Sequence, residues 1–191
     1  MDIVADLMKQ VMTGDNLSLI SKSVGGDGKA VQSALGMGIP LVVGSMASTA
    51  SKPGGTDILT KMLAQGASNN PMDNLGGFLG NPAAAGGSGM VSTLFGSQMG
   101  TIQNAISQKT GLPPVAVSKV LEIATPMVMG YVGKMFVQQN MDTKSLTTLL
   151  GDQSKLALQA SPEAAGMARQ LMGAPESAAG ISGMFKKVLG K

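Results

Sequence analysis

The sequence predicts an all-α protein, a helical bundle built from two pseudo-symmetric helical repeats whose long helices are kinked at proline. Composition predicts the fold class: aromatic residues are only 3% of the chain, so aliphatic residues and Met must supply the core, which favours helix over sheet. An internal duplication predicts the architecture. Residues 20–46 align with residues 106–132 at a constant offset, and the identical pairs are Ile20/Ile106, Ser21/Ser107, Gly25/Gly111, Ala30/Ala116, Val31/Val117, Leu35/Leu121, Pro40/Pro126, Val42/Val128 and Gly44/Gly130.

Each copy is expected to begin with a short helix that leads into a long one. Gly25 and Gly111 would end the short helices, because helices often end at a left-handed residue and glycine adopts that conformation most easily. Asp27 is placed to cap the long helix of the first copy. Pro113 and Pro114 open the long helix of the second copy, where the missing N–H of proline costs nothing. Both copies therefore have clear helix boundaries.

Proline recurs in the middle of both long helices, at Pro40 and Pro126. A proline inside a helix removes one hydrogen bond and clashes with the carbonyl four residues earlier, so each long helix is expected to bend there. Gly44 and Gly130 follow at the same distance and would allow another backbone to approach closely. Apolar residues at helical spacing along 117–135 predict the buried face.

The helices around this duplicated core divide the chain into four segments. A short helix follows each long one, as TDILTKML and TKSLTTLL, and MDIVADLMKQVM predicts an amphipathic helix at the N-terminus. DQSKLALQA predicts a separate short helix, and Ser161-Pro162 predicts the start of the next. The segments are an N-terminal helix with the first repeat at 1–65, a connecting segment at 66–100, the second repeat at 101–151 and C-terminal helices at 152–191.

The connecting segment at 66–100 is rich in Gly, Ala and Asn, and residues 74–108 carry no charge at all. One interpretation is a flexible linker. However, apolar residues interrupt it, and these could dock on the repeats or on another subunit. The candidates for self-association are Leu75, Phe78, Leu79, Leu94 and Phe95.

Residues 30–51 form a long uncharged stretch that raises the question of a membrane span. Ser, Thr, Gly and Pro dilute its apolar character, and Lys119, Glu122 and Lys134 interrupt the equivalent helix of the second copy. A buried core helix is therefore the favoured interpretation. The acidic start of the chain is unlike a secretory signal, and we expect a cytoplasmic protein.

Several kinds of chemistry are disfavoured by composition. The chain has no Cys and no His, which removes the thiol nucleophile, zinc thiolates and the commonest general base. No phosphate-loop, calcium-loop or G-x-S-x-G motif is present. A single Arg and few aromatics argue against nucleic-acid binding. We expect no catalytic residues, no cofactor and no metal. The 16 Met residues are interpreted as core filling, with a soft binding surface as the alternative.

The C-terminal stretch ends in apolar and basic residues, including Phe185, Lys186 and Lys187. This pattern is consistent with a helix lying on a lipid or membrane surface. The alternative is a packed helix whose lysines complement its dipole.

The chain resembles the YidB-like family of small, Gly- and Ala-rich helical proteins of bacteria. The resemblance rests on NLGGFLG, on AISQKTGL from Ala105 and on the helix that ends in ATPMVMGYVGK, and it covers roughly residues 15–150. It implies a bacterial origin and an all-helical fold. The function of that family is unassigned, so it implies no catalytic residues.

The favoured hypothesis is a non-enzymatic structural protein that self-associates through apolar, charge-poor surfaces into a homo-oligomer, a large assembly or a filament. One alternative is a module that binds lipid or another apolar ligand in a cavity between the repeats, near Pro40 and Pro126. The other alternative is a peripheral membrane protein attached through its C-terminal helix.

Overall fold

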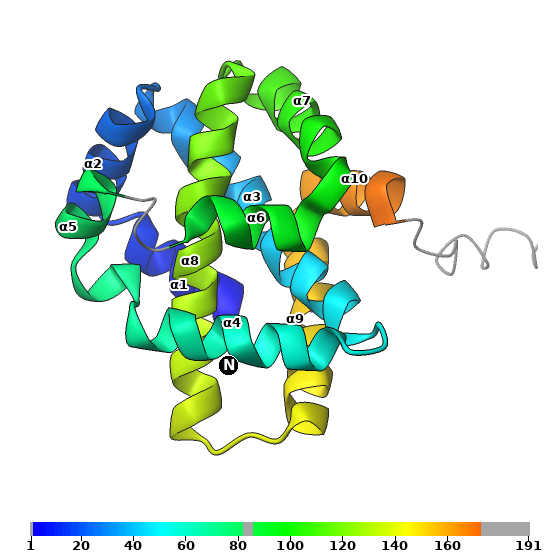
Figure 1. The fold of residues 1–191 in the computed structure, drawn as a ribbon. Coiled ribbons are helices and arrows are strands. Elements are labelled where there is room, and N and C mark those ends of the chain that lie inside the picture. Colours follow the sequence, from blue (N-terminus) through cyan, green and yellow to red (C-terminus); the bar gives the residue numbers. More distant parts are fainter. Residues whose placement is uncertain (1, 82–85, 173–191) are drawn as a thin grey trace, which may run out of the picture.

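The computed structural model describes residues 2–81 and 86–172, and all regular structure in these residues is helical, as the composition predicted (Figure 1). Sequence predictions for residues 173–191, including Phe185, Lys186 and Lys187, lie outside the described residues. The elements are α1 (Ile3–Val11), α2 (Gly14–Val24), α3 (Gly28–Ala50), α4 (Gly55–Ser68), η1 (Pro71–Asp73), α5 (Leu75–Gly80), α6 (Gly87–Phe95), η3 (Gly96–Gln98), α7 (Met99–Thr110), α8 (Pro114–Gln138), α9 (Thr143–Ala160) and α10 (Pro162–Met172).

The predicted helix boundaries in the duplicated region are confirmed. α2 and α7 end at Gly25 and Gly111, which have left-handed φ values of 76° and 75°. The Asp27 carboxylate accepts hydrogen bonds from the first turn of α3, and α8 starts directly after Pro113. These local signals depend on neighbours in sequence alone, which is why they could be predicted without knowledge of the tertiary packing.

α3 and α8 form the centre of the molecule. Both helices continue without interruption past their internal prolines, Pro40 and Pro126. By length and composition alone each helix could cross a membrane, but 72% of the apolar window of each is buried inside the protein. Val42 and Val128, which follow the two prolines at equivalent positions, are fully buried. In this structure the two helices therefore serve as core helices.

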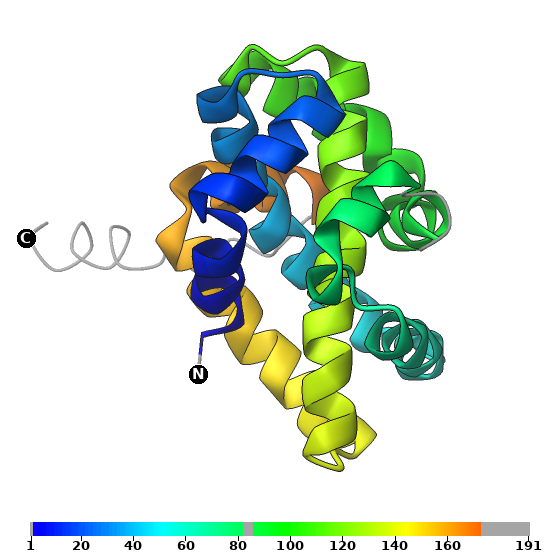
Figure 2. The ribbon, with the colours of Figure 1, turned by 90° about the vertical axis from the view of Figure 1, so that its left-hand side faces the viewer.

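Each central helix packs mainly against helices from the other half of the chain. α8 lies against α4 and α6, whereas α3 lies against α9 and α10. Figure 1 shows α4 and α6 crossing α8, and Figure 2 shows α9 running beside the central helices from the opposite side. α9 follows α8 after only four residues, yet α9 packs on α3 and hardly touches α8. Neither half of the chain therefore completes its own core.

The crossing of α4 and α8 is a contact between backbones. A Cβ atom at Gly133 would lie 2.3 Å from the carbonyl oxygen of Leu63, and one at Gly66 would lie 2.8 Å from the carbonyl carbon of Met129. At Gly130 a Cβ would lie 2.6 Å from Oδ1 of Asn70, which caps η1. Only glycine allows helices to approach this closely.

α1 closes the other side of the core through one buried polar contact. The Ile3 amide donates a hydrogen bond of 2.7 Å to Oε1 of Gln153 on α9, and both residues are buried. A helix leaves its first amides without internal partners, so the Gln153 side chain satisfies a group that would otherwise be buried unpaired.

One sequence prediction, and one of two interpretations that the sequence leaves open, differ from the structure. The sequence predicts a separate short helix after residue 151, but α9 continues without interruption to Ala160, because Leu150, Gln153 and Ala157 keep one face of it buried. A flexible linker is one interpretation of residues 66–100, but the described part of this segment forms η1, α5 and α6. The apolar residues in both stretches explain why these segments fold onto the core.

Replacing Gly133 with Ala is expected to destabilise the protein by about 1–3 kcal/mol, because the added methyl group would displace the Leu63 backbone. The measurement is urea unfolding followed by circular dichroism. Gly151→Ala in α9 is the matched control, because a Cβ atom at this position would have nothing within 4 Å. The control should gain about 0.5–1 kcal/mol from the better helix propensity of Ala. Equal effects of the two substitutions would contradict the close crossing.

Candidate functional site

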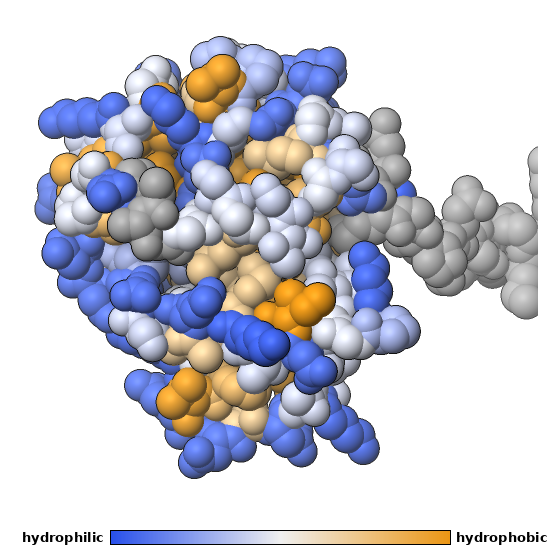
Figure 3. All heavy atoms as spheres, viewed as in Figure 1, coloured by the Kyte–Doolittle hydropathy of each residue, from blue (hydrophilic) through white to orange (hydrophobic). Residues whose placement is uncertain are grey.

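The charge-free part of the chain contributes a neutral helix to the surface of the molecule. Residues 74–108 contain no charged residue, and within them α6 lies across α8. Figure 3, in the orientation of Figure 1, shows this helix as a pale band with hydrophilic residues above it and apolar residues directly below it. The residues of α6 that face solvent are small and neutral: Ser88, Gly89, Ser92 and Thr93. We call these four residues the α6 face.

A proline on α8 and a glycine on α6 hold the α6 face in position. Pro126 has no N–H, so it cannot bond to the carbonyl of Glu122 four residues earlier. Gly87, the first residue of α6, packs on that carbonyl: a Cβ at Gly87 would lie only 2.4 Å from the Glu122 oxygen. Met90, Val91 and Phe95 complete the contact as buried residues of α6. The neutral face is therefore supported by a rigid element.

The structure separates the five residues that the sequence suggests for self-association. Leu75, Phe78 and Phe95 are buried in the core. These three residues therefore dock on the protein's own helices, which is one of the two alternatives, and not on another subunit. Leu79 and Leu94 are only partly buried and remain available to a partner. Leu94 adjoins the α6 face, and its role in association stays a prediction.

Sequence reasoning missed several exposed apolar side chains. Among the described residues, the large hydrophobic side chains with substantial exposure are Leu19, Ile58, Val115, Val137 and Leu156. Val115 is 70% exposed, and it lies just before the buried positions Ala116 and Val117. The helical spacing used to identify the buried face could have shown that Val115 lies away from it.

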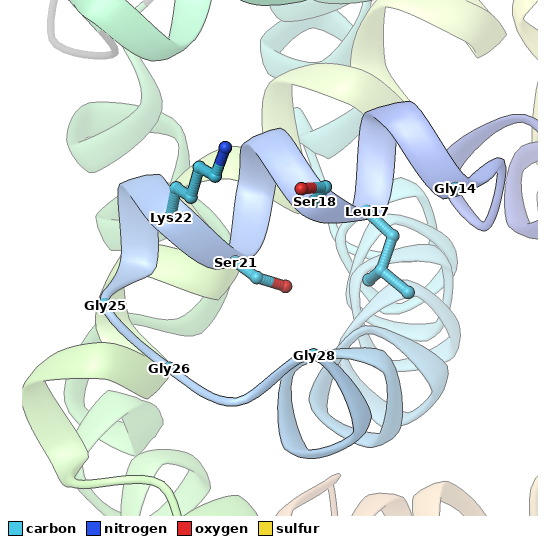
Figure 4. A pocket seen from close by; sticks show the side chains of 8 residues that line it. All are labelled: Gly14, Leu17, Ser18, Ser21, Lys22, Gly25, Gly26 and Gly28. Atoms are coloured by element: carbon cyan, nitrogen blue, oxygen red, sulfur yellow. The ribbon is translucent and has the colours of Figure 1, made fainter.

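The described residues also form surface hollows. One, of about 560 Å³, lies between α2 and the loop that leads into α3, and it is lined mostly by Gly and Ser (Figure 4). Ser21 points into this space, and its buried hydroxyl has no hydrogen-bond partner, whereas the equivalent Ser107 bonds to the Leu112 carbonyl at 2.6 Å. Two further hollows, of about 430 and 450 Å³, lie beside α10. None of the three lies between Pro40 and Pro126.

The titratable groups form pairs and not clusters. Within residues 2–81 and 86–172, no group of three or more Asp, Glu, His or Cys side chains is arranged to hold a metal ion. Lys134 and Asp73 form an ion pair of 2.6 Å between α8 and η1, at a solvent-exposed position. Tyr131 on α8 donates a hydrogen bond of 3.3 Å to Asp6 on α1. Burial, followed by the charge of Asp6 and this hydrogen bond, raises the pKa of Tyr131.

These contacts connect helices to one another. Tyr131 and Asp6 join α8 to α1, and Lys134 and Asp73 join α8 to η1. The part of the surface that stands out is the neutral α6 face.

Comparison with known proteins gives one match. Residues 6–135 match the model of a family described as “Bacterial protein of unknown function (DUF937)”. This match agrees with the resemblance found in the sequence. No curated protein and no solved structure matches the chain.

Tyr131 is the single tyrosine of the chain and Trp is absent, so absorbance titration reports its pKa directly. We expect a midpoint above the ordinary value of 10.0 in the native protein. Asp6→Asn should lower the midpoint but leave it above the ordinary value, because burial is the larger cause. Asp15→Asn, an acidic residue in the first turn of α2, controls for net charge. An unchanged midpoint in Asp6→Asn would contradict the contact.

The same shift makes stability depend on pH. Since the folded state holds the Tyr131 proton more tightly than the unfolded state, its contribution is fully present below pH 10 and is lost as the pH rises through the raised value. Tyr131→Phe should therefore show a smaller loss of stability than the natural protein as the pH is raised above 10, measured by urea unfolding. Equal losses would contradict the assignment.

Proposed function

The chain belongs to this family of bacterial proteins of unknown function, so we infer its role from its own surface. We propose that it is a non-enzymatic structural protein that self-associates. The observation that supports the proposal is the α6 face. The uninterrupted charge-free run at residues 74–108 contributes to it, and α6 is held rigidly on α8. Two copies that meet through this face bury neutral, small side chains.

Charge explains why such a face favours association with another copy. Charged side chains keep proteins apart in solution, because burying one at an interface costs its hydration unless a partner compensates. The α6 face has no such cost, and its small side chains allow a second helix to approach closely. Leu94, partly exposed beside it, adds apolar area to the contact. A second copy presents the same surface, so two copies can meet about a two-fold axis with the same residues on both sides of the contact.

The proposal includes the finer architecture. We propose that the first repeat, within residues 1–65, and the second repeat, at residues 101–151, are two copies of one unit, related by pseudo-symmetry, with a bend at Pro40 and Pro126. Its support is the correspondence between the copies: Ile20 and Ile106 are both fully buried, and each long helix packs on the helix that follows the other.

Two alternatives rank below self-association. Binding of lipid or another apolar ligand has less support, because the described hollow beside α2 is lined largely by Gly and Ser. Attachment to a membrane through Phe185, Lys186 and Lys187 concerns residues outside those described. The cytoplasmic location also remains a prediction.

The test of the proposal is the mass of the purified chain in solution, measured by light scattering from about 1 to 200 μM at low and high salt. We expect dimers or larger particles that persist at high salt, since neutral contacts are not screened. Electron microscopy of the same sample would show whether they are discrete or extended. A monomer at every concentration would overturn the proposal.

Thr93→Lys is expected to weaken the association at least about tenfold, because it places a charge in the contact. Thr148→Lys on α9 is the matched control. Both threonines are exposed in helices, and each donates its hydroxyl to the carbonyl four residues earlier, at 2.9 and 3.1 Å. The two substitutions therefore remove the same bond and add the same charge. Equal weakening by both would show that net charge, and not the α6 face, controls association.

A further inference from the structure

The connection between α8 and α9 is short, exposed and conformationally unusual. It consists of Gln139, Asn140, Met141 and Asp142, which are all exposed or only partly buried. Asn140 has a φ of 46° and is the one non-glycine among the described residues with a positive φ. A left-handed conformation is unfavourable for residues other than glycine, although asparagine tolerates it best. The turn therefore holds the chain in a conformation that a straight helix would relieve.

The segment after this turn, α9 and α10, makes its contacts far from α8. α9 packs on α3, and α10 packs on α3, α9 and α7, whereas α8 and α9 hardly touch. The buried side chains of the segment include Leu146, Leu150 and Met167. Opening the turn therefore gives up little contact between α8 and α9. The segment also touches α1, α4 and α7, and the Ile3 amide bonds to Gln153. All the contacts that the segment loses can be restored by the same helices of another copy, because the two surfaces are identical.

We propose that the turn at residues 139–142 is a hinge, and that two copies of the chain exchange their α9–α10 segments to form a closed two-fold dimer. In the exchanged form α8 continues through the hinge into α9, and no Gly or Pro in residues 139–142 prevents a continuous helix. Each α9–α10 segment then packs on the α3 of the partner. Exchange of identical elements needs no new interface, since the contacts already exist within one copy.

This proposal rests on the proposed function and extends it by explaining how association could continue beyond two copies. A single chain has one α6 face, and a contact between two such faces about a two-fold axis closes after two copies. An exchanged dimer has two α6 faces, because α6 precedes the hinge and stays with its own α8. Exchange and face contacts in alternation therefore generate an extended assembly.

The hinge offers substitutions with opposite expected effects. Asn140→Gly removes the conformational cost of the turn, so it should favour the monomer. The double substitution Asn140→Ala, Asp142→Ala favours the straight helix for two reasons. Alanine at position 140 disfavours the left-handed conformation. Alanine at position 142 removes the cap of α9, in which the Asp142 carboxylate accepts a hydrogen bond of 2.7 Å from the Ser145 amide. Gln139→Ala is the control, since this neighbouring exposed residue has a φ of −94° and requires no special conformation.

The experiment is carried out on the full chain carrying Thr93→Lys, so that contacts through the α6 face are suppressed. Monomer and dimer are separated by size after warming at about 100 μM. Relative to Gln139→Ala, the double substitution should raise the dimer-to-monomer ratio roughly three- to tenfold, and Asn140→Gly should lower it by a similar factor. Ratios that match the control in both variants would overturn the exchange.

Hydrogen exchange of the separated species provides a readout that does not depend on the hinge variants. In the monomer the amides of residues 139–141 already donate to carbonyls of α8, so the informative amides are those of residues 142–144 at the start of α9, where a helix leaves its amides without internal partners. In an exchanged dimer the continuous helix supplies these partners and the amides of residues 142–144 become protected, while the rest of α9 and α10 keep the protection they have in the monomer. A dimer in which the amides of residues 142–144 exchange as fast as those of the monomer would overturn the proposal. The proposed function is judged separately, on the protein that lacks the Thr93→Lys substitution. Association of that protein through the α6 face should add protection to residues 87–95 and leave the amides of residues 142–144 unchanged.

Discussion

The close crossing of α4 and α8 is the constraint on which the rest of the structure depends. Gly66, Gly130 and Gly133 bring the two backbones together at distances that exclude any side chain. Because α4 lies so close to α8, η1 can follow directly with Asn70 against Gly130, and Lys134 can reach Asp73. α6 then crosses the same helix where Pro126 leaves the Glu122 carbonyl without its helical donor. The position of the neutral face is thus set by contacts between main-chain atoms, and it does not depend on the conformations of long side chains.

Packing between the two halves makes stability a property of the whole chain. α8 is covered by helices that precede it, and α3 is covered by helices that follow α8. A half that contained only its own helices would leave the apolar side of its central helix in water, where each large side chain costs about 1.5–3 kcal/mol. We therefore interpret the molecule as one cooperative unit, even though its sequence contains a duplication.

The sequence predicted those features of the fold that depend on neighbouring residues. Gly25, Asp27 and Gly111 set helix ends through local conformation and local hydrogen bonds, and the structure confirms all three. It did not predict which helices pair, because an apolar stripe fits many partners equally well. The same limit explains the candidate residues: the pattern marked Phe78 and Phe95 as apolar but could not show that the protein's own core covers them. The continuous α9 was missed because its break at Gly151-Asp152 is overridden by burial on α3.

The pairing of distant helices also affects how the protein is made. α3 ends at Ala50, but the helix that covers it starts only at Thr143. At ribosomal rates of about 5–20 residues per second, α9 is synthesised roughly 5–20 seconds after α3. The apolar side of α3 that α9 will cover stays exposed during that time. During this interval the nascent chain presents an uncovered apolar helix, which chaperones recognise. Neighbouring ribosomes on one messenger hold several such chains close together, so the first α9 that an α3 meets can come from another chain.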